Sequence, residues 1–448
     1  MTIPPGPRLP PILQAACVTA APYGWMRRRW RRHGDVFSSK FPYYGRVVYV
    51  ADPAEVKRVF TGDPAVFHAG EANILALGGV LGDHSLLTLD EERHLSQRKV
   101  LLPPFHGESV RRYTDVMAEA TAREVACWPL HRVFPLRPRM QAITLEVILR
   151  AVFGVREGER MDRYREWIPR LADASSVINW LPFMQRDVGG MSPAARFRRA
   201  LGEVNSLIYA EIRDRRGSGE AHDRGDALSL LLRARHEDGS AMTDGELRDE
   251  LLTLLTAGHE TTATGLSWAF ERLLRTPRVL GRLIESLDDD DYLEAVVKET
   301  LRVRPVVVDV ARRLTRETEI AGYRLPTGTI VLAAIAVVHA RPDLYPSPHE
   351  FRPERFLDGR TESYAWIPFG GGVRRCIGAS FAQVEMKVVL REVLRRVRLR
   401  APSQRPERPR TQHVTVVPSR GARVVVEERL AQPAVREPAA VAGAATAP

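Results

Sequence analysis

The sequence predicts a mainly α-helical protein with small β-sheets. Three observations support this fold class in the 448-residue chain. Residues from about 90 to 300 follow a helical pattern that only short polar breaks interrupt, short strand-like segments occur toward both ends, and no change in composition marks a second domain. We therefore expect a helix-rich domain over residues 34–429, preceded by a lead (1–33) and followed by an Ala/Pro-rich, disordered tail (430–448).

The lead is rich in proline and then strongly basic. Residues 12–21 are weakly apolar and too short to span a membrane, and no stretch of the chain reaches the ~20 apolar residues that a span needs. The run Arg27-Arg28-Arg29-Trp30-Arg31-Arg32 should belong to a first helix that ends near His33-Gly34. A solvated helix face is the simpler interpretation of this run, and contact with anionic lipid is the alternative.

Strands are expected on both sides of the helical region. Val36-Phe37 and Val47–Val50 read as strands, and Asp52-Pro53 reads as the start of a helix over 54–60. Further strands are predicted at residues 323–325 and 330–336, with a C-terminal hairpin at about 414–426. All of these sheets should be small beside the helical part.

Composition and charge limit the classes of function. Three cysteines rule out a disulfide framework and favour a reducing compartment, so we expect a cytoplasmic location. The net charge of +11 could serve an acidic partner. No nucleic-acid-binding motif accompanies it, so no nucleic-acid partner is expected.

The most informative segment is Phe369-Gly-Gly-Gly-Val-Arg-Arg-Cys-Ile-Gly378. Cys376 follows three glycines and two arginines, and an apolar helical pattern begins just after it. Helix amides and adjacent cations should lower the pKa of this thiol. The glycines would let the backbone approach a large flat group, and a thiolate facing such a group is a ligand of haem iron. An isolated cysteine would more simply be a buried apolar side chain.

This segment resembles the haem-binding loop of the cytochrome P-450 family, whose signature is Phe-x-x-Gly-x-Arg-x-Cys-x-Gly. The resemblance implies the P-450 fold, a triangular helix-rich single domain, and haem b (iron protoporphyrin IX) as cofactor. It also implies that Cys376 binds the iron and that the loop residues Phe369, Gly370 and Gly378 contact the haem.

The hexapeptide Ala257-Gly-His-Glu-Thr-Thr262 lies in a long helical pattern that should begin with a Thr243/Glu246 capping box. A small residue inside a helix makes room for a ligand, and an acid beside a hydroxyl can deliver protons to bound dioxygen. An ordinary helix whose threonines bond to backbone carbonyls is the alternative. The hexapeptide is similar to the family's oxygen-activation motif, which implies catalytic roles for Glu260 and Thr261 and haem contact at Ala257.

The pair Glu299-x-x-Arg302 would, in isolation, be a minor surface ion pair. It is similar to the Glu-x-x-Arg motif of the same family, whose third member is the arginine of Phe351-Arg-Pro-Glu-Arg355-Phe. The resemblance implies a buried structural network of Glu299, Arg302 and Arg355 that touches neither iron nor substrate.

Cationic side chains are the natural partners of the two haem propionates. His94 and Arg98 lie at an (i, i+4) spacing on one helix face, and a solvated basic face is the alternative. The resemblance assigns propionate contacts to His94, Arg98, Arg374 and one arginine of Ala311-Arg-Arg-Leu314. We choose Arg313, with Arg312 as the alternative.

The resemblance implies a soluble bacterial type of monooxygenase that inserts one oxygen atom from O2 into an apolar substrate such as a fatty acid, terpene or steroid. Expected pocket residues are Trp180, Phe183, Leu254 and Val307. Because no Gly-x-Gly-x-x-Gly flavin or nicotinamide motif is present, electrons should come from a small acidic ferredoxin with an NAD(P)H-dependent reductase. We expect a monomer with a basic proximal face that docks the acidic donor. The candidates for this face are Lys99, Arg111, Arg112, Arg374, Arg375 and Lys387.

Two alternatives remain open from the sequence. One is a member of the same family that carries out a non-hydroxylating oxidation, such as phenol coupling or dehydration. The other is a haem protein that binds gas without catalysis, against which the acid and hydroxyl of Glu260 and Thr261 argue.

Overall fold

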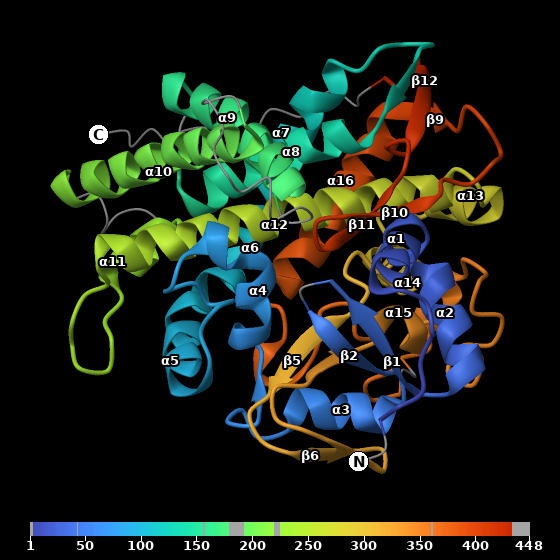
Figure 1. The fold of residues 1–448 in the computed structure, drawn as a ribbon. Coiled ribbons are helices and arrows are strands. Elements are labelled where there is room, and N and C mark those ends of the chain that lie inside the picture. The colour runs from blue at the N-terminus through green and yellow to red at the C-terminus, as the bar shows by residue number, and fades with distance from the viewer. Residues whose placement is uncertain are drawn as a thin grey trace, which may run out of the picture.

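The computed structural model describes residues 3–42, 44–155, 157–178, 192–218, 225–359 and 362–431. The chain is mainly helical with small sheets, which confirms the predicted fold class (Figure 1). The helices are α1 Pro11–Ala20, α2 Pro22–His33, α3 Pro53–Thr61, α4 Gly70–Leu81, α5 Glu91–Leu101, α6 Glu108–Arg111, α7 Thr114–Ala126, α8 Arg137–Val152, α9 Glu159–Ile178, α10 Pro193–Gly217, α11 Ala227–Arg233, α12 Asp244–Leu273, α13 Pro277–Glu285, α14 Asp290–Val303, α15 Ile335–Val338 and α16 Ala379–Arg396.

The strands are β1 Val36–Phe41, β2 Gly45–Val50, β3 Phe67–His68, β4 Val133–Pro135, β5 Val310–Leu314, β6 Thr318–Ile320, β7 Tyr323–Leu325, β8 Ile330–Ala333, β9 Val397–Arg400, β10 Pro409–Gln412, β11 Thr415–Pro418 and β12 Arg423–Arg429. They form one five-stranded sheet in the order β1-β2-β8-β5-β3, a three-stranded sheet β4-β12-β9 and two hairpins.

Helix α12 crosses the molecule and organises the core (Figure 1). Its first turn is closed by the predicted capping box, in which the Thr243 hydroxyl accepts from the Glu246 amide and the Glu246 carboxylate accepts from the Thr243 amide. Most of its side chains are buried against α8, α10, α14 and α16. A helix that is buried on nearly every side can present residues to an internal site.

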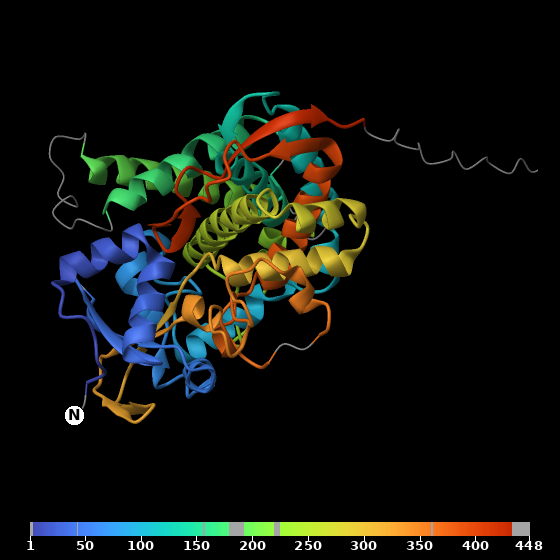
Figure 2. The ribbon, with the colours of Figure 1, turned by 90° about the vertical axis from the view of Figure 1, so that its right-hand side faces the viewer.

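The five-stranded sheet lies beside α2 and α3, apart from the helical bundle around α9 and α10 (Figure 2). Parallel pairing of β2 with β8 joins the N-terminal hairpin β1–β2 to the later strands. Strand β5 pairs with β8 on one side and with β3 on the other, with Arg312 opposite Val331 and Arg313 opposite both Ile330 and His68. This sheet therefore fixes the position of both candidate propionate arginines.

Two strand predictions need correction. The strand predicted over residues 330–336 ends at Ala333, where its pairing with β2 stops at Val50, and the helical turn α15 begins at Ile335. The hairpin predicted at 414–426 does not form between β11 and β12. Strand β11 pairs with β10, whereas β12 pairs with β4 and β9, so distant partners decide the pairing of two apolar segments.

The lead forms two helices. Residues 11–20 make α1, and α2 ends at His33 after the basic run, as predicted. Gly34 follows with a φ of +86°, a conformation that favours glycine. Within the described part of the chain, no helix combines the length and the apolar character needed to cross a membrane. Most of the predicted disordered tail, residues 432–448, lies outside the described residues.

Candidate active site

The cysteine loop is a set of tight turns before α16. The Cys376 amide donates to the Phe369 carbonyl at 2.9 Å, the Gly370 amide donates to Ile367, and the Arg375 amide donates to Gly372. The Phe369 ring packs edge-on against Trp366 with centroids 5.9 Å apart. Helix α16 begins at Ala379, directly after Gly378. The loop is therefore held by its own backbone, and Cys376 lies just before a helix N-terminus.

The glycines of this loop serve mainly the approach of other protein segments, which differs from the expectation that all three make room for a flat group. A Cβ on Gly372 would lie 1.9 Å from the Phe60 carbonyl oxygen of α3, and one on Gly371 would meet Tyr364 and Phe60 below 3 Å. Gly372 also has a φ of +63°. At Gly370, with a φ of +68°, a Cβ would meet nothing within 4 Å.

Replacing Gly372 with alanine should lower the melting temperature of the protein. The positive φ costs about 1–2 kcal/mol for a residue with a Cβ, and the overlap with α3 adds about 1–3 kcal/mol. Gly359→Ala is the matched control, because Gly359 has a φ of +66° and no atom within 4 Å of the added Cβ. Equal melting temperatures for the two variants would show that the α3 contact does not constrain the loop.

Cys376 is accessible at its surface yet surrounded by protein on other sides. Burial raises the pKa of the Cys376 thiol, against smaller opposite effects of the Gly378 amide and of Arg98 and Arg375. The expectation that cations and helix amides dominate this pKa is therefore wrong for the protein chain by itself. A bound cation such as a metal ion would favour the thiolate form of this desolvated sulfur.

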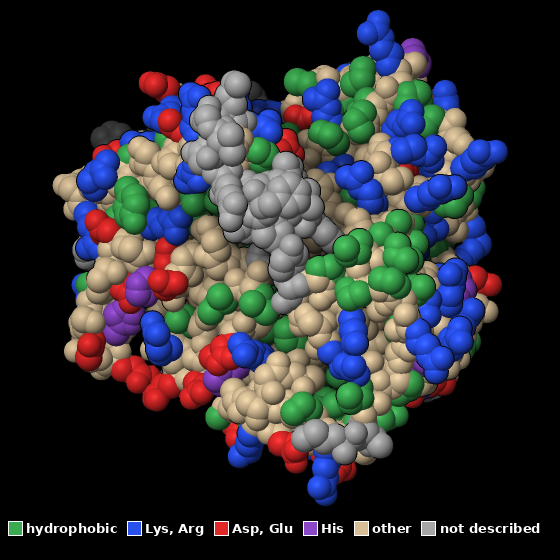
Figure 3. All heavy atoms as spheres, in the orientation of Figure 1, with side chains coloured by type: hydrophobic (Ala, Val, Ile, Leu, Met, Phe, Trp, Pro, Cys, Tyr) green, Lys and Arg blue, Asp and Glu red, His purple; other side chains and the backbone are tan. Residues whose placement is uncertain are grey.

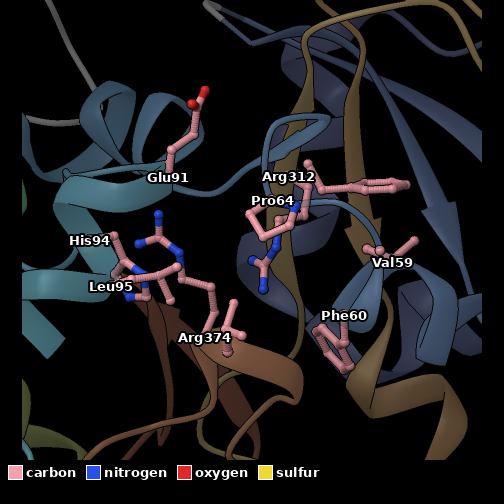
Figure 4. A pocket seen from close by; sticks show the side chains of 11 residues that line it. Val59, Phe60, Pro64, Glu91, His94, Leu95, Arg312 and Arg374 are labelled. Carbon is pink, nitrogen blue, oxygen red and sulfur yellow. The ribbon is translucent and has the colours of Figure 1, made fainter. Parts of the chain in front are cut away.

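Two arginines and a histidine of the site lie close together and largely out of solvent. His94 of α5, Arg312 of β5 and Arg374 of the cysteine loop lie around one narrow opening (Figure 4). Desolvation and the charges of Arg374, Arg98 and Arg312 lower the pKa of His94 to about 3. Desolvation and neighbouring cations likewise lower the pKa of both Arg312 and Arg374 to about 10, although Asp90 opposes this. Two arginines whose pKa is lowered by desolvation and by neighbouring cations, with His94 neutral beside them, indicate a site for anions.

Asp90 is the carboxylate that partly compensates this cluster. It forms an ion pair with Arg374 at 2.6 Å and also accepts from the backbone amides of Gly70 and Glu71. Arg374 donates further to the carbonyls of Leu86 and Leu89. Glu91 also lines the opening, but its carboxylate lies 2.8 Å from a ring nitrogen of His68. The guanidinium groups of Arg312 and Arg374, which meet here from β5 and the cysteine loop, are donors suited to carboxylates such as the haem propionates. The residues of this opening therefore fit a haem edge.

Arg313, the residue chosen from the sequence, lies outside this cluster. Its side chain is 46 % exposed and pairs with Glu71 at 3.5 Å, whereas Arg312 is 6 % exposed and lines the opening. The alternation of a strand explains the difference, because Arg312 shares its face with the buried Leu314. The structure thus favours the alternative, Arg312.

Arg98 lies one helical turn after His94, as expected from the spacing. Its guanidinium donates to the Arg375 carbonyl at 2.7 Å. The positive charge of Arg98 also lowers the pKa of the Cys376 thiol. Arg98 therefore joins α5 to the cysteine loop.

The oxygen-activation segment lies in the middle of α12. Ala257 is exposed and Thr261 is half-buried, whereas Leu254, Leu255 and Thr262 nearby are buried, so the stripe of Ala257 and Thr261 is accessible. The Thr261 hydroxyl donates to the Ala257 carbonyl at 2.7 Å. Gly258 does not make room for a ligand, because a Cβ there would lie 2.9 Å from Ile148 of α8. The glycine instead allows two helices to pack closely.

Glu260 points to α8 and is not brought into contact with Thr261. Its carboxylate binds Arg137 and accepts from the Gln141 amide at 2.6 Å. Adjacent positions on a helix face different directions, which accounts for the separation. Arg137 and Gln141 were missed from the sequence, because their contact with Glu260 joins residues more than a hundred positions apart.

The network of Glu299, Arg302 and Arg355 is assembled as the motifs imply. Arg302 donates to Glu299 at 2.6 and 2.8 Å, and Arg355 lies 3.4 Å from the same carboxylate. Glu299 also accepts from the Arg352 amide, and Arg302 donates to the carbonyls of His339, Pro348 and Glu350. Both Glu299 and Arg302 are fully buried. The network thus ties α14 to the segment that leads to the cysteine loop.

The predicted substrate residues are only partly described. Leu254 is buried on the same face of α12 as Ala257 and Thr261, and Val307 is half-buried in the segment before β5. Trp180 and Phe183 lie outside the described residues.

Glu385 is a further residue that sequence reasoning missed. It is fully buried on α16, and burial raises its pKa well above the ordinary value, with Thr262 as hydrogen-bond partner. A lone glutamate in an amphipathic helix gives no sequence signal of such a position.

Comparisons with known proteins identify the family. The cytochrome P450 family model matches residues 4–426. Two Mycobacterium tuberculosis proteins, named "Putative cytochrome P450 135B1" and "Putative cytochrome P450 138", are 47 % and 39 % identical over 95 % of this chain and cover 92 % and 97 % of their own lengths.

Solved structures agree. The chain matches a retinoic acid-bound cyanobacterial CYP120A1 at a TM-score of 0.80 and 25 % identity, over 96 % of this chain and 100 % of that one. It matches the haem domain of cytochrome P450DA at a TM-score of 0.83 and 24 % identity, over 96 % and 98 %. The family binds haem b through a cysteine thiolate. The chain therefore belongs to the cytochrome P450 family of monooxygenases.

Proposed function

We propose that Cys376 is the thiolate ligand of haem b and that this monooxygenase inserts one oxygen atom from O2 into an apolar substrate. The observation that supports the assignment is the cation cluster of Arg312 and Arg374, with neutral His94 beside it, at the cysteine loop. Cys17 on α1 and Cys127 after α7 are both exposed and lie in no such cluster. Of the three cysteines, Cys376 alone combines an anion-attracting pocket with a helix N-terminus.

The residues present would hold the cofactor at its edge and at its two faces. Arg98, Arg312 and Arg374 would bind the propionates, with His94 as a neutral donor. Phe369, Gly370 and Gly378 would contact one face from the cysteine loop, and Ala257 the other from α12. Bound haem supplies the iron that activates dioxygen, and a thiolate ligand donates electron density that favours O–O cleavage.

Arg312→Leu should weaken haem binding by about tenfold or more, because a charge-assisted hydrogen bond to a propionate contributes about 1.5–3 kcal/mol. Arg313→Leu, next in the strand but half exposed, should leave haem affinity within twofold of the wild type. Haem transfer to apomyoglobin measures both. Equal loss in the two variants, or loss in Arg313→Leu alone, would restore Arg313 as the propionate ligand.

Glu260 and Thr261 would serve proton delivery in two parts. The Thr261 hydroxyl keeps its oxygen lone pairs free to accept while it donates to Ala257. Glu260 must leave Arg137 and Gln141 before its carboxylate can pass protons toward Thr261. Arg137 and Gln141 would therefore hold the acid in its resting position.

Thr261→Ala should uncouple turnover, so that more peroxide forms per reducing equivalent consumed. The loss of the hydroxyl removes the acceptor through which protons reach the distal oxygen. Thr256→Ala is the matched control, because Thr256 is also half-buried on α12 and donates to the Leu252 carbonyl at 2.8 Å. Peroxide yield measured with the same donor should rise in the first variant alone, and unchanged coupling there would remove Thr261 from the relay.

The substrate is proposed to be a fatty acid, terpene or steroid-like molecule. Leu254 supplies an apolar side chain on the Ala257 face of α12, and Val307 is a half-buried apolar side chain before β5. Apolar walls with few polar groups are usual for such ligands. One similar structure is that of a retinoic acid complex, which is consistent with an extended apolar ligand.

Electrons are proposed to come from a small acidic ferredoxin with an NAD(P)H-dependent reductase, acting on a monomer. Arg111, Arg112 and Arg375 are exposed and remain candidates for docking. Arg374 points inward to Asp90, and Lys99 and Lys387 are paired with Glu237 and Asp290, so these three support docking less directly.

Turnover under labelled dioxygen tests the proposed reaction. Spectral titration with lipids, terpenes and steroids first selects a ligand, and the holoprotein is then supplied with ferredoxin, reductase and NADPH. We expect one labelled oxygen atom in the product. A desaturated or coupled product without the label would indicate a non-hydroxylating oxidation, and binding without any product would contradict the enzymatic proposal.

A further inference from the structure

Helix α1 is oriented against the usual rule for a surface helix. Its one fully buried side chain is Gln14, whereas Ile12 is 73 % and Leu13 51 % exposed. Ile3 and Leu9 of the preceding lead are exposed as well. Because a water-facing helix normally buries its apolar residues, this reversed arrangement marks an apolar face that lacks a partner within the described chain.

The buried glutamine fixes the helix in this orientation. The Gln14 side-chain amide donates to the Leu9 carbonyl at 2.7 Å, and its oxygen accepts from the Lys40 amide of β1 at 3.1 Å. The lead is tied to the same strand, since Ser38 donates through its amide to Pro5 and through its hydroxyl to Pro4. The exposed apolar residues are therefore held on the body of the protein and are not part of a loose tether.

The charged side chains of residues 1–34 are all positive. Residues 1–34 contain six arginines and no aspartate or glutamate, so they carry more than half of the chain's net charge of +11. Arg28, Arg31 and Arg32 are exposed on α2, and none of the three forms an ion pair within the described residues. Figure 3 shows hydrophobic side chains gathered over α1 with Lys and Arg side chains next to them over α2.

We propose that α1 and α2 form a docking surface for anionic lipid, in which Ile3, Leu9, Ile12 and Leu13 enter the interface and Arg28, Arg31 and Arg32 bind the headgroups. Such a surface needs an apolar part that enters the lipid and a basic part that binds the headgroups. The apolar residues of the lead supply the first part, and the arginines of α2 supply the second. Helix α1 has 10 residues and is thus about 15 Å long. It would lie in the plane of a bilayer whose apolar core is about 30 Å thick.

This inference stands on the lead alone and does not depend on the proposed substrate. An apolar substrate would, however, be concentrated in the same lipid. An acidic protein would account for the arginines as well, but it gives no specific reason for an adjoining helix without any charged residue to expose its isoleucine and leucine.

Flotation of the haem-loaded full chain with vesicles tests the proposal. Vesicles of phosphatidylcholine with phosphatidylglycerol should carry the protein at low salt, and phosphatidylcholine alone should carry much less. Ile12→Glu/Leu13→Glu should weaken binding by about tenfold or more, because it removes two apolar side chains from the interface and places two negative charges against anionic headgroups. Arg28→Gln/Arg31→Gln/Arg32→Gln should weaken it similarly and remove its salt dependence.

Leu130→Glu/Val133→Glu is the matched control, since these residues are similarly exposed but lie near β4. It should float as the wild type does, and unchanged melting temperatures will show that every variant is folded. Absence of flotation with anionic vesicles would overturn the proposal. Wild-type flotation of Ile12→Glu/Leu13→Glu would also overturn it, because binding would then be purely electrostatic. Loss of ferredoxin-driven turnover in the arginine variant without any vesicle binding would instead identify a protein-docking surface.

Discussion

Replacing Cys376 with alanine will abolish the red-shifted Soret band of the reduced, carbon monoxide-treated protein. In the wild type this band should lie near the wavelength from which the family takes its name. Removal of the sulfur takes away the electron-donating ligand, so turnover should fall to the background of free haem. The cation cluster does not include the thiol, and the variant should therefore still bind haem, at lower affinity. Absorption spectra of the purified variant measure both effects.

Cys17→Ala and Cys127→Ala are the controls for this prediction. Both residues are exposed, and Cys127 makes only a weak contact from its sulfur to the Arg123 carbonyl at 3.6 Å. Their spectra and turnover should equal those of the wild type. An unchanged Soret band in Cys376→Ala, or its loss in either control, would refute the ligand assignment.

Arg302→Leu should destabilise the protein by about 3–5 kcal/mol, the usual cost of removing one partner from a buried ion pair. The change would leave Glu299 buried with Arg355 as its remaining cation, and it would also leave the carbonyls of His339 and Pro348 without their donor. Chemical denaturation followed by circular dichroism measures the loss. Because the hydrogen bonds of Arg302 go to Glu299 and to carbonyls of residues 339–350 and not to the cysteine loop, the folded fraction should keep the wild-type Soret position.

Arg278→Gln is the matched control for the buried network. Arg278 also pairs with a glutamate, Glu354, at 2.9 Å, but its side chain is 63 % exposed. Exposed pairs contribute about 0.2–1 kcal/mol, so this variant should unfold close to the wild type. Similar losses in Arg302→Leu and Arg278→Gln would show that the buried network does not stabilise the fold.

Features encoded in consecutive residues could be predicted from the sequence. The capping box of α12 and the end of α2 at Gly34 need no partner from elsewhere in the chain, and they are found where predicted. The orientation of the two β5 arginines was also accessible in principle. Leu314, two residues after Arg312, indicated which face of the strand is buried.

Other features depend on contacts between distant segments and were therefore out of reach. Gly258 is explained by Ile148 of α8, and Gly372 by the carbonyl of Phe60, neither of which a local pattern reveals. In the protein chain by itself, burial outweighs the amide and the cations that were predicted to lower the pKa of Cys376, because the sequence shows the neighbouring charges but not the degree of burial. The partners of Glu260 on α8 belong to the same class.

The bond between the Cys376 sulfur and haem iron can be measured most directly by X-ray absorption at the iron edge. The wild-type holoprotein should show one sulfur scatterer in the first coordination shell of the iron, and Cys376→Ala should show none. A wild-type shell of nitrogen and oxygen alone, or a sulfur scatterer that persists in Cys376→Ala, would contradict the central claim.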